Sequence, residues 1–284
     1  MEGVMSSMDL AREALKRKRK LETSVDSPPP ACTEHQETDP VKGGKGYNVY
    51  GSMNRTYDDV GVFNVPLTPT TILMGKAGLH SYNSHEGRSL QFKSVTRARA
   101  RFPPMNYYVT MEAIDPHSSS PVTIEACVCH ASSNNANLTL ITTSCCIQGS
   151  KEDSSSWDED GVDLLYRGVM PKWLDDGTEK HLKYYEVKES ELQENEWLHI
   201  YAHVAAYSEW SNRVVDYFPL KIEKVMVQTM EHVEPNVNTF KSSSGIFYIS
   251  FKTCGGLNCR GIIRQTMDGR PQHVCLEAVC EIDK

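Results

Sequence analysis

Alternation of apolar and polar residues predicts two groups of β-strands in this chain. The runs of this kind lie at 107–113, 122–129, 138–143 with an extension toward Ile147, 197–204, 220–227 and 246–251. Two further runs, 259–267 and 272–280, flank an Asp-Gly-Arg-Pro turn at 268–271, which predicts a β-hairpin. The connections are rich in Pro, Ser and Asn, as is usual between antiparallel strands.

Helical spacing of apolar residues is weaker and predicts one main helix in the middle of the chain. Residues 84–99 place Leu90, Val95 and Ala98 on one face, with Ser84 as the N-cap. The pair Pro103-Pro104 would stop that helix. Residues 71–80 are expected to form a strand or a buried turn, and 188–194 a single helical turn.

The order of these elements predicts an α+β fold with helices on one face of an antiparallel sheet. A helix followed by several strands occurs twice, in segments 47–149 and 164–284. Between them, residues 150–163 place Ser154-Ser155-Ser156 among acidic residues. Since like charges resist packing, we expect a solvated acidic loop there.

The first 46 residues differ in composition from the rest. Residues 6–21 predict a short helix with Met8, Ala11 and Leu15 at helical spacing, too short a seam for more than a weak coiled coil. Residues 22–46 carry three successive prolines and a Gly-Gly-Lys-Gly run. Such segments bury little surface, so we expect 1–46 to be a basic helix followed by a disordered linker.

The charge of the chain is unevenly distributed. The net charge is −7, and residues 1–21 hold six Lys/Arg against three Asp/Glu, so −7 less +3 leaves −10 for 22–284. An acidic body gives no strong evidence for nucleic-acid binding. The run Lys16-Arg17-Lys18-Arg19-Lys20 is typical of a nuclear import signal read by an import receptor; the alternative is a solvated helix end.

The remaining composition bears on the compartment. No apolar run reaches the roughly 18–20 residues of a membrane span, and Met1–Lys20 does not have the apolar core of a secretory signal. The nine cysteines are an odd number. We therefore expect reduced thiols in the nucleus or cytoplasm.

Four cysteines are the weak candidates for a metal site. Cys254 and Cys259 are five residues apart, as are Cys275 and Cys280, with His273 nearby. A zinc site could use such ligands, but on a strand Cys275 and Cys280 would point to opposite faces. The alternative is that they are buried thiols acting as small apolar residues.

A common type of hydrolase or nucleotide-binding enzyme is expected to show a catalytic motif in its sequence, and this chain shows none of three such patterns. The chain has no Gly-x-Ser-x-Gly, phosphate-loop or His-Glu-x-x-His pattern. His199 and His203 have the spacing of metal ligands on a helix, but the strand predicted at 197–204 favours a partly buried structural pair. We therefore expect a non-enzymatic protein without a cofactor.

Several long runs resemble one plant family. They are Leu164–Trp173, Tyr184–Ala202, Val225–Thr229 and Ile246–Phe251. Over 47–284 the chain is similar to a family of uncharacterised proteins that is expanded in crucifers and named after the male-sterility-five protein.

The resemblance carries expectations about fold and function. It implies a cystatin/monellin-like fold, in two related halves, and a nuclear interaction factor in reproductive development, required for meiosis and male fertility, with unknown protein partners. An alternative is an inhibitor of papain-like cysteine proteases. However, the Gln-x-Val-x-Gly hairpin of such inhibitors is missing after the strand that ends at Cys127–Ser132.

Overall fold

A computed structural model of the chain describes residues 61–102, 105–132, 137–150, 155–174, 184–228 and 243–283. These residues belong to one compact unit that spans Tyr47–Lys284. The predicted helix at 6–21, the linker at 22–46 and the basic run Lys16–Lys20 lie outside the described residues.

One antiparallel sheet organises the described residues. Its ten strands follow the order β1-β2-β3-β4-β5-β10-β9-β8-β7-β6. The N-terminal region, 61–150, supplies β1 (Val62–Asn64), β2 (Gln91–Arg101), β3 (Met105–Ile114), β4 (Pro121–Ser132) and β5 (Leu138–Ile147). The C-terminal region, 184–283, supplies β6 (Tyr185–Glu186), β7 (Lys221–Gln228), β8 (Gly245–Lys252), β9 (Asn258–Thr266) and β10 (Val274–Ile282). The two regions join where β5 pairs with β10, with Leu276 opposite Leu140.

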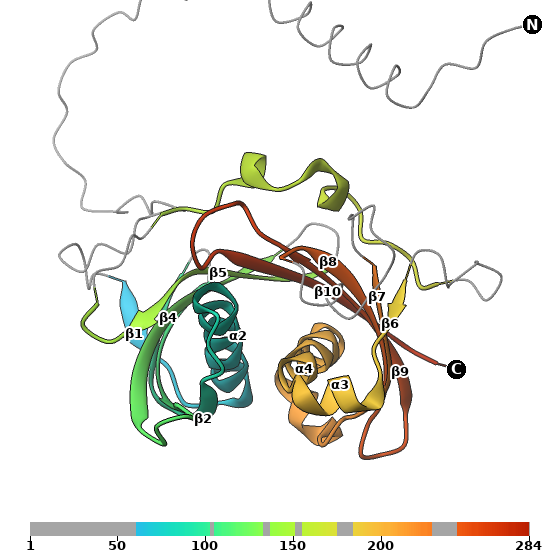
Figure 1. The fold of residues 1–284 in the computed structure, drawn as a ribbon, viewed down its shortest axis with the longest axis horizontal. Helices are drawn as coiled ribbons and strands as arrows, with labels where there is room; N and C mark the ends of the chain where they lie inside the picture. The colour runs from blue at the N-terminus through green and yellow to red at the C-terminus, as the bar shows by residue number, and fades with distance from the viewer. Residues whose placement is uncertain are drawn as a thin grey trace, which may run out of the picture. The chain divides into compact units, whose positions relative to one another are not determined.

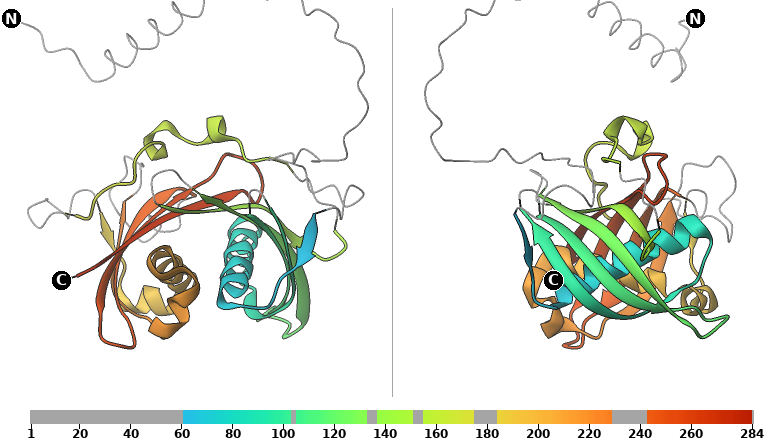
Figure 2. Two further views of the ribbon diagram at one scale, coloured as in Figure 1. Left: turned by 180° about the vertical axis from the view of Figure 1, so that it is seen from behind. Right: turned by 90° about the vertical axis from the view of Figure 1, so that its left-hand side faces the viewer.

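Three helices lie on the concave face of the curved sheet (Figures 1 and 2). They are α2 (Pro69–Glu86), α3 (Glu189–Glu194) and α4 (Trp197–Trp210). In both regions a short strand and a helical segment precede four long strands; the helical segment is α2 alone in the N-terminal region, and α3, α4 and the 3-10 helix η4 (Ser211–Tyr217) in the C-terminal region. The predicted α+β class, a large antiparallel sheet with few helices, is therefore confirmed.

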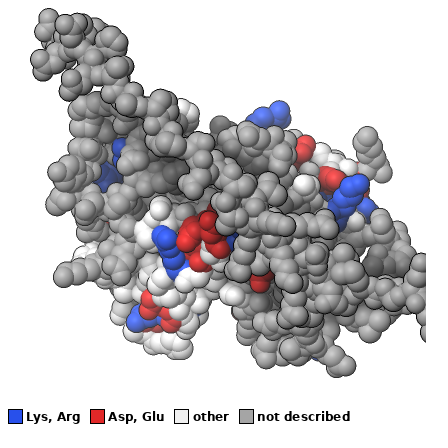
Figure 3. All heavy atoms as spheres, turned by 90° about the horizontal axis from the view of Figure 1, so that it is seen from above, with Lys and Arg blue, Asp and Glu red and all other residues white. Residues whose placement is uncertain are grey.

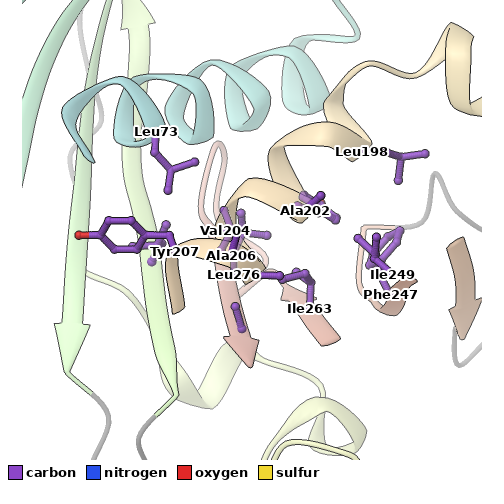
Figure 4. Close-up of a cluster of buried hydrophobic side chains, with 14 of the residues drawn as sticks. Leu73, Leu198, Ala202, Val204, Ala206, Tyr207, Phe247, Ile249, Ile263 and Leu276 are labelled. Carbon is purple, nitrogen blue, oxygen red and sulfur yellow. The ribbon is translucent and has the colours of Figure 1, made fainter. Parts of the chain in front are cut away.

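The main core fills the space between α2, α4 and the sheet. Figure 4 shows Leu73 of α2 pointing toward the α4 residues Val204 and Tyr207. On the sheet side, Phe247 and Ile263 are at most 1% exposed. Burial of so much apolar area contributes most of the favourable free energy of folding.

Helix α2 lies where we predicted a strand or turn at 71–80, so that prediction is wrong. Thr68 caps the helix by accepting from the Thr71 amide, and Pro69 occupies the first turn, where it is tolerated. The helix is buried along much of its length and shows little amphipathic pattern. A buried helix of this kind cannot be distinguished from a strand by periodicity alone.

The helix predicted at 84–99 is also wrong. Helix α2 ends at Glu86 because Gly87 adopts a left-handed conformation with φ of 61°. Strand β2 then begins at Gln91 and carries two register shifts against β3. These irregularities explain why Leu90, Val95 and Ala98, which are all buried, have a spacing that imitates a helix.

The strand predicted at 197–204 is instead the first half of α4. The letters Trp-Leu-His-Ile-Tyr-Ala-His-Val alternate like a strand, but the helix is surrounded by the sheet and α2 and is apolar on most sides. Ala202, Ala205 and Ala206 then favour a helix by their intrinsic propensity. Tertiary burial therefore overrides the local alternation.

The other strand predictions are confirmed. The runs at 107–113, 122–129, 138–147, 220–227 and 246–251 lie in β3, β4, β5, β7 and β8, and β9–β10 form the predicted hairpin. The helical turn at 188–194 is α3. The blurred alternation of β7 after Lys224 follows from a register shift between Ile222 and Lys224.

The structure bears on the prediction of no membrane span through its helices. Among the helices of the described residues, none is both long enough and apolar enough to cross a bilayer.

Candidate interaction site on the convex face of the sheet

A segment that we call the strap, residues 155–174, crosses the face of the sheet opposite to the helices (Figure 1). It connects the two regions and contains two short 3-10 turns, η1 (Glu159–Gly161) and η2 (Leu164–Tyr166). Three large apolar side chains of the strap face solvent: Leu164 is 75%, Leu165 53% and Val169 84% exposed. Exposed apolar groups gathered on one segment mark candidate protein-interaction sites.

A buried arginine holds the backbone of the strap. Arg264 of β9 is only 4% exposed and forms an ion pair with Glu277 of β10 at 2.5 Å. Its guanidinium also donates to the carbonyls of Gly168 at 2.9 Å and Val169 at 3.4 Å. A planar guanidinium with several donors suits this bridging role.

Further contacts pin the strap on either side of that point. Tyr166 is buried and its hydroxyl donates to the carbonyl of Ser244 at 3.2 Å. Arg167 donates to the carbonyls of Val162 and Asp160 at 2.8 and 2.6 Å. Met170 packs in a small core on the convex face with Met226, Tyr248 and Ile262. The strap therefore turns Tyr166 and Met170 inward, is braced internally by Arg167, and turns three apolar side chains outward.

The start of the strap is held by three side chains, Ser155, His273 and Asp268, which we call the anchor cluster. His273 Nδ1 lies 2.8 Å from Asp268 Oδ2, and its Nε2 lies 3.2 Å from Ser155 Oγ. Asp268 also accepts from the backbone amides of Asp158 at 2.9 Å and Arg270 at 3.0 Å. These bonds connect the strap to the turn of the β9–β10 hairpin.

The anchor cluster has the connectivity of a Ser-His-Asp catalytic triad, but its burial favours a structural role. His273 is 0% exposed, and the Trp157 indole stacks on it with ring centroids 6.1 Å apart. Neither Ser155 nor His273 lines the cavities that border the strap. A histidine that serves as general acid must reach the leaving group, and this ring is covered.

Two cavities border the strap. One of about 330 Å³ has Trp173, Met226 and Tyr248 in its wall, with charged residues at its rim. The other, about 590 Å³, lies beside η1 and η2 and is lined by Tyr166, Asp163 and the 269–271 turn, among others. Both are large enough to receive a side chain of a partner.

Charges on the convex face are largely compensated. Where the described residues are visible in Figure 3, Lys/Arg groups lie next to Asp/Glu groups. The pairs include Lys224–Glu186 at 2.6 Å and Arg260–Asp283 at 2.8 Å. This pattern is not that of an extended basic surface for nucleic acid.

The structure brings only two of the four candidate zinc ligands together, because the thiols of Cys259 and Cys280 interact with each other. Cys254 is exposed and donates to the Asp216 carbonyl, whereas Cys259 and Cys275 are buried and Cys280 is half-buried. Within the residues that the structure describes, no three His, Cys, Asp or Glu side chains gather as metal ligands. Burial raises the pKa of the Cys259 and Cys275 thiols, which favours their uncharged form.

His199 and His203 lie on a helix rather than on the predicted strand. Burial, followed by the positive charge of Lys76, lowers the pKa of His203 to about 4, so it is neutral at pH 7. Its ring lies 4.6 Å from that of Phe218. Both side chains are half-buried, as expected, and among the residues that the structure describes no third metal-ligating side chain gathers with them.

Sequence reasoning missed the anchor cluster. The described part of the predicted acidic loop, 155–163, is attached to the sheet rather than free in solvent, so that prediction is corrected there; 151–154 lie outside the described residues. Ser155 and His273 are 118 positions apart, and only the β9–β10 turn brings them together. The acidic residues of this segment do not indicate, in the sequence, a contact between Ser155 and His273.

Comparison with known proteins identifies the family. The family model described as Protein MS5 matches residues 170–276. One UPF0725 protein of Arabidopsis thaliana is 51% identical and covers 72% of this chain and 73% of its own length. A second from the same plant is 34% identical and covers 73% and 63%. None of these names describes a protease inhibitor, so the inhibitor alternative gains no support.

A solved structure gives the same assignment at the level of fold. The crystal structure of MS5 from Brassica napus aligns with a TM-score of 0.59 at 22% identity, over 76% of this chain and 98% of that chain. At this identity the likeness shows a shared fold. The 51% identical relative, of which the chain covers 73%, establishes that the chain belongs to the plant family of UPF0725 proteins, and the family model described as Protein MS5 matches its residues 170–276.

Proposed function

We propose that the chain is a non-enzymatic protein-interaction factor in plant reproductive development, and that the strap is its partner-binding surface. The observation that carries the proposal is the combination of a pinned backbone with exposed Leu164, Leu165 and Val169. A rigid segment loses little conformational entropy on binding, so its apolar contacts contribute more fully to affinity. Family membership supports the reproductive role.

The partner that fits this surface is an apolar segment with basic residues beside it. Glu159, Asp160 and Asp163 lie within the strap next to the exposed leucines, and all three are exposed. Complementary charge would steer a basic partner to this end of the strap. The cavity of about 590 Å³ beside η2 offers space for one of its side chains.

The test compares strap variants with a matched surface variant. Leu164→Asp/Val169→Asp should lose a partner captured from flower buds, whereas Leu257→Asp, at another exposed leucine, should retain it. The captured protein must then bind the purified chain directly, with at least tenfold weaker affinity for the strap variant. Equal binding by all three proteins would overturn the role of the strap.

A nuclear location and a role in meiosis belong to the same proposal. The run Lys16–Lys20 supports it because it is typical of sequences bound by an import receptor. A fluorescent fusion should lose nuclear accumulation when these five residues become Ala, and male meiosis should fail in a plant that lacks the gene. Unchanged accumulation would refute the assignment of the signal.

We also propose that the two regions are related, cystatin-like units. The repeated order of elements and the outward strand order from β5–β10 support this relation. A crystal structure in which α2 with β2–β5 does not superpose on α4 with β7–β10 would contradict it.

A further inference from the structure

We propose that Ser155 is a phosphorylation site for a protein kinase that selects acidic sequences, and that phosphorylation releases the start of the strap from the sheet. The inference rests on the proposed function, because the strap is the surface whose presentation would change. Three observations carry it: the bond that Ser155 makes, the light hold on its neighbours and the charges that follow it.

The hydroxyl of Ser155 has a specific task in the anchor cluster. Because Asp268 accepts from His273 Nδ1, a neutral imidazole has only Nε2 left to accept a hydrogen bond. The Ser155 hydroxyl lies 3.2 Å from that nitrogen and, in this tautomer, donates to it. The strap thus begins with a contact that requires the proton of this one hydroxyl.

The backbone around Ser155 is only lightly held. Residues 155–157 form no backbone–backbone hydrogen bond with any part of the chain that the structure describes. Their attachments are the Ser155 hydroxyl, the Trp157 stack on His273 and a bond from Arg270 to the Ser156 carbonyl at 2.5 Å. A half-buried serine in such a segment can enter a kinase active site after local opening, which costs far less than global unfolding.

The residues after Ser155 are acidic. Asp158 follows at the third position, then Glu159 and Asp160. A kinase with a basic peptide-binding groove binds such a segment by charge complementarity.

The reaction removes the proton on which the contact depends. ATP supplies the γ-phosphoryl group: a bond forms between its phosphorus and Ser155 Oγ, the bond to the ADP oxygen breaks, and the hydroxyl proton passes to the kinase's base. The product carries a charge of about −1.5 to −2 at pH 7. Asp268, on the far side of the His273 ring, repels that charge, whereas Arg270, bonded to the Ser156 carbonyl, attracts it. Because the phosphate cannot be buried against the covered His273 ring without a large desolvation cost, the contact with His273 is lost.

The experiment uses the full chain, ATP and an acid-directed casein kinase. Mass spectrometry should place phosphate on Ser155 in the native protein and in Ser156→Ala, which is the matched control, because Ser156 is exposed and also precedes acidic residues. Hydrogen exchange at the amides of Asp158 and Gly161, both bonded in the strap, should become about tenfold faster in the phosphorylated protein. Ser155→Glu should show a smaller acceleration in the same direction.

Two results would overturn the inference. One is phosphate confined to Ser154 or Ser156 in the native protein; the other is phosphorylated Ser155 with unchanged exchange at Asp158 and Gly161. No partner takes part in this measurement. A negative result therefore leaves the interaction role of the strap intact, and a failed partner capture leaves this site intact.

Discussion

The N-terminal and C-terminal regions place their helices against the sheet equally closely, but they achieve this in opposite ways. In the N-terminal region the helix supplies the glycine: a Cβ added to Gly78 of α2 would lie 2.5 Å from the Cβ of Ala126 on β4. In the C-terminal region the strand supplies it: a Cβ on Gly261 of β9 would lie 2.5 Å from the Cβ of Ala205 on α4.

This difference shows that the structure requires one absent methyl group at the contact, not a glycine on a given element. In each region the contact joins the helix to the third strand that follows it. Either partner can be the small one, because only the sum of the two side-chain volumes is limited. Aligning the two regions by their glycines would therefore miss the equivalence.

Of the single substitutions, Gly261→Ala should destabilise the protein most. The added methyl group overlaps Ala205, with the Phe251 ring also at 3.3 Å, so the helix must move. We expect a loss of about 3 kcal/mol in the free energy of unfolding, measured with urea. Gly255→Ala is the control, since its nearest neighbour would be 3.9 Å away.

The same contact allows a sharper test. Gly261→Ala combined with Ala205→Gly places the glycine on the helix, as in the N-terminal region. The double variant should regain much of the stability that Gly261→Ala loses, but it should remain less stable than the native protein by about 1 kcal/mol because a glycine within a helix is unfavourable. Gly78→Ala alone should be milder than Gly261→Ala because alanine favours the helix. A double variant no more stable than Gly261→Ala would break the comparison.

Arg264→Ala should have the next largest effect. It leaves Glu277, which is about a fifth exposed, without its cation and removes the donors to Gly168 and Val169. We expect about 2.5 kcal/mol lower stability, discounted for that exposure. Limited proteolysis of Arg264→Ala should cut the strap first near 164–170. Arg264→Lys should recover only part of the lost stability, because a single ammonium group cannot bridge the Glu277 carboxylate and the strap carbonyls at the same time.

Acid should weaken the contact between the two helices. Burial lowers the pKa of His80 to about 4, and its Nε2 lies 3.0 Å from the Tyr201 hydroxyl of α4. The folded pKa is below the ordinary 6.5, so stability is full above pH 6.5 and falls toward pH 4.

Relative to pH 8, the loss attributable to His80 at pH 5 should be about 2 kcal/mol. Urea unfolding across this range measures it. His80→Gln keeps hydrogen-bonding groups without titrating, so its stability should depend less on pH. An identical pH profile for both proteins would show that His80 does not control the acid response.

Arg97→Ala should have the smallest effect. Arg97 lies on β2 of the N-terminal region, is exposed, and forms no ion pair with any acid in the described residues. We expect a change within about 0.5 kcal/mol by urea unfolding. Its contrast with Arg264 separates a surface arginine from one that holds the strap, and a large loss at Arg97 would remove that distinction.

Strand positions were predictable because the side chains of a strand alternate between a buried and an exposed face. Strand β3 follows this pattern in its second half and β5 follows it up to Thr143, whereas β4 departs from it at the register shift between Cys127 and Val128. The two long helices were missed because α2 and α4 are covered on most sides, which leaves no polar stripe to reveal a period of 3.6. The capping pair Thr68 and Pro69 is the local signal that could have revealed α2.

The candidate site was predictable only as a sequence signature. The run Leu164–Trp173 carries the family resemblance, but its letters do not tell which side chains face solvent. Leu164 and Val169 are outside while Tyr166 is inside, because Arg264 and the Ser244 carbonyl fix the backbone from distant strands. From hydrophobicity alone, Leu164 and Val169 would be expected inside and Tyr166 outside.

The family resemblance, the antiparallel strands and the turn of the β9–β10 hairpin can be read from the amino-acid sequence, because they depend on neighbours a few residues apart. The folded structure was needed to show that 71–80 and 197–204 are helical and that the strap is pinned with its apolar side chains exposed. It alone joined Ser155 to His273 across 118 positions. The reason is that burial and long-range polar contacts outweigh local propensity, which is worth about 1 kcal/mol or less per residue.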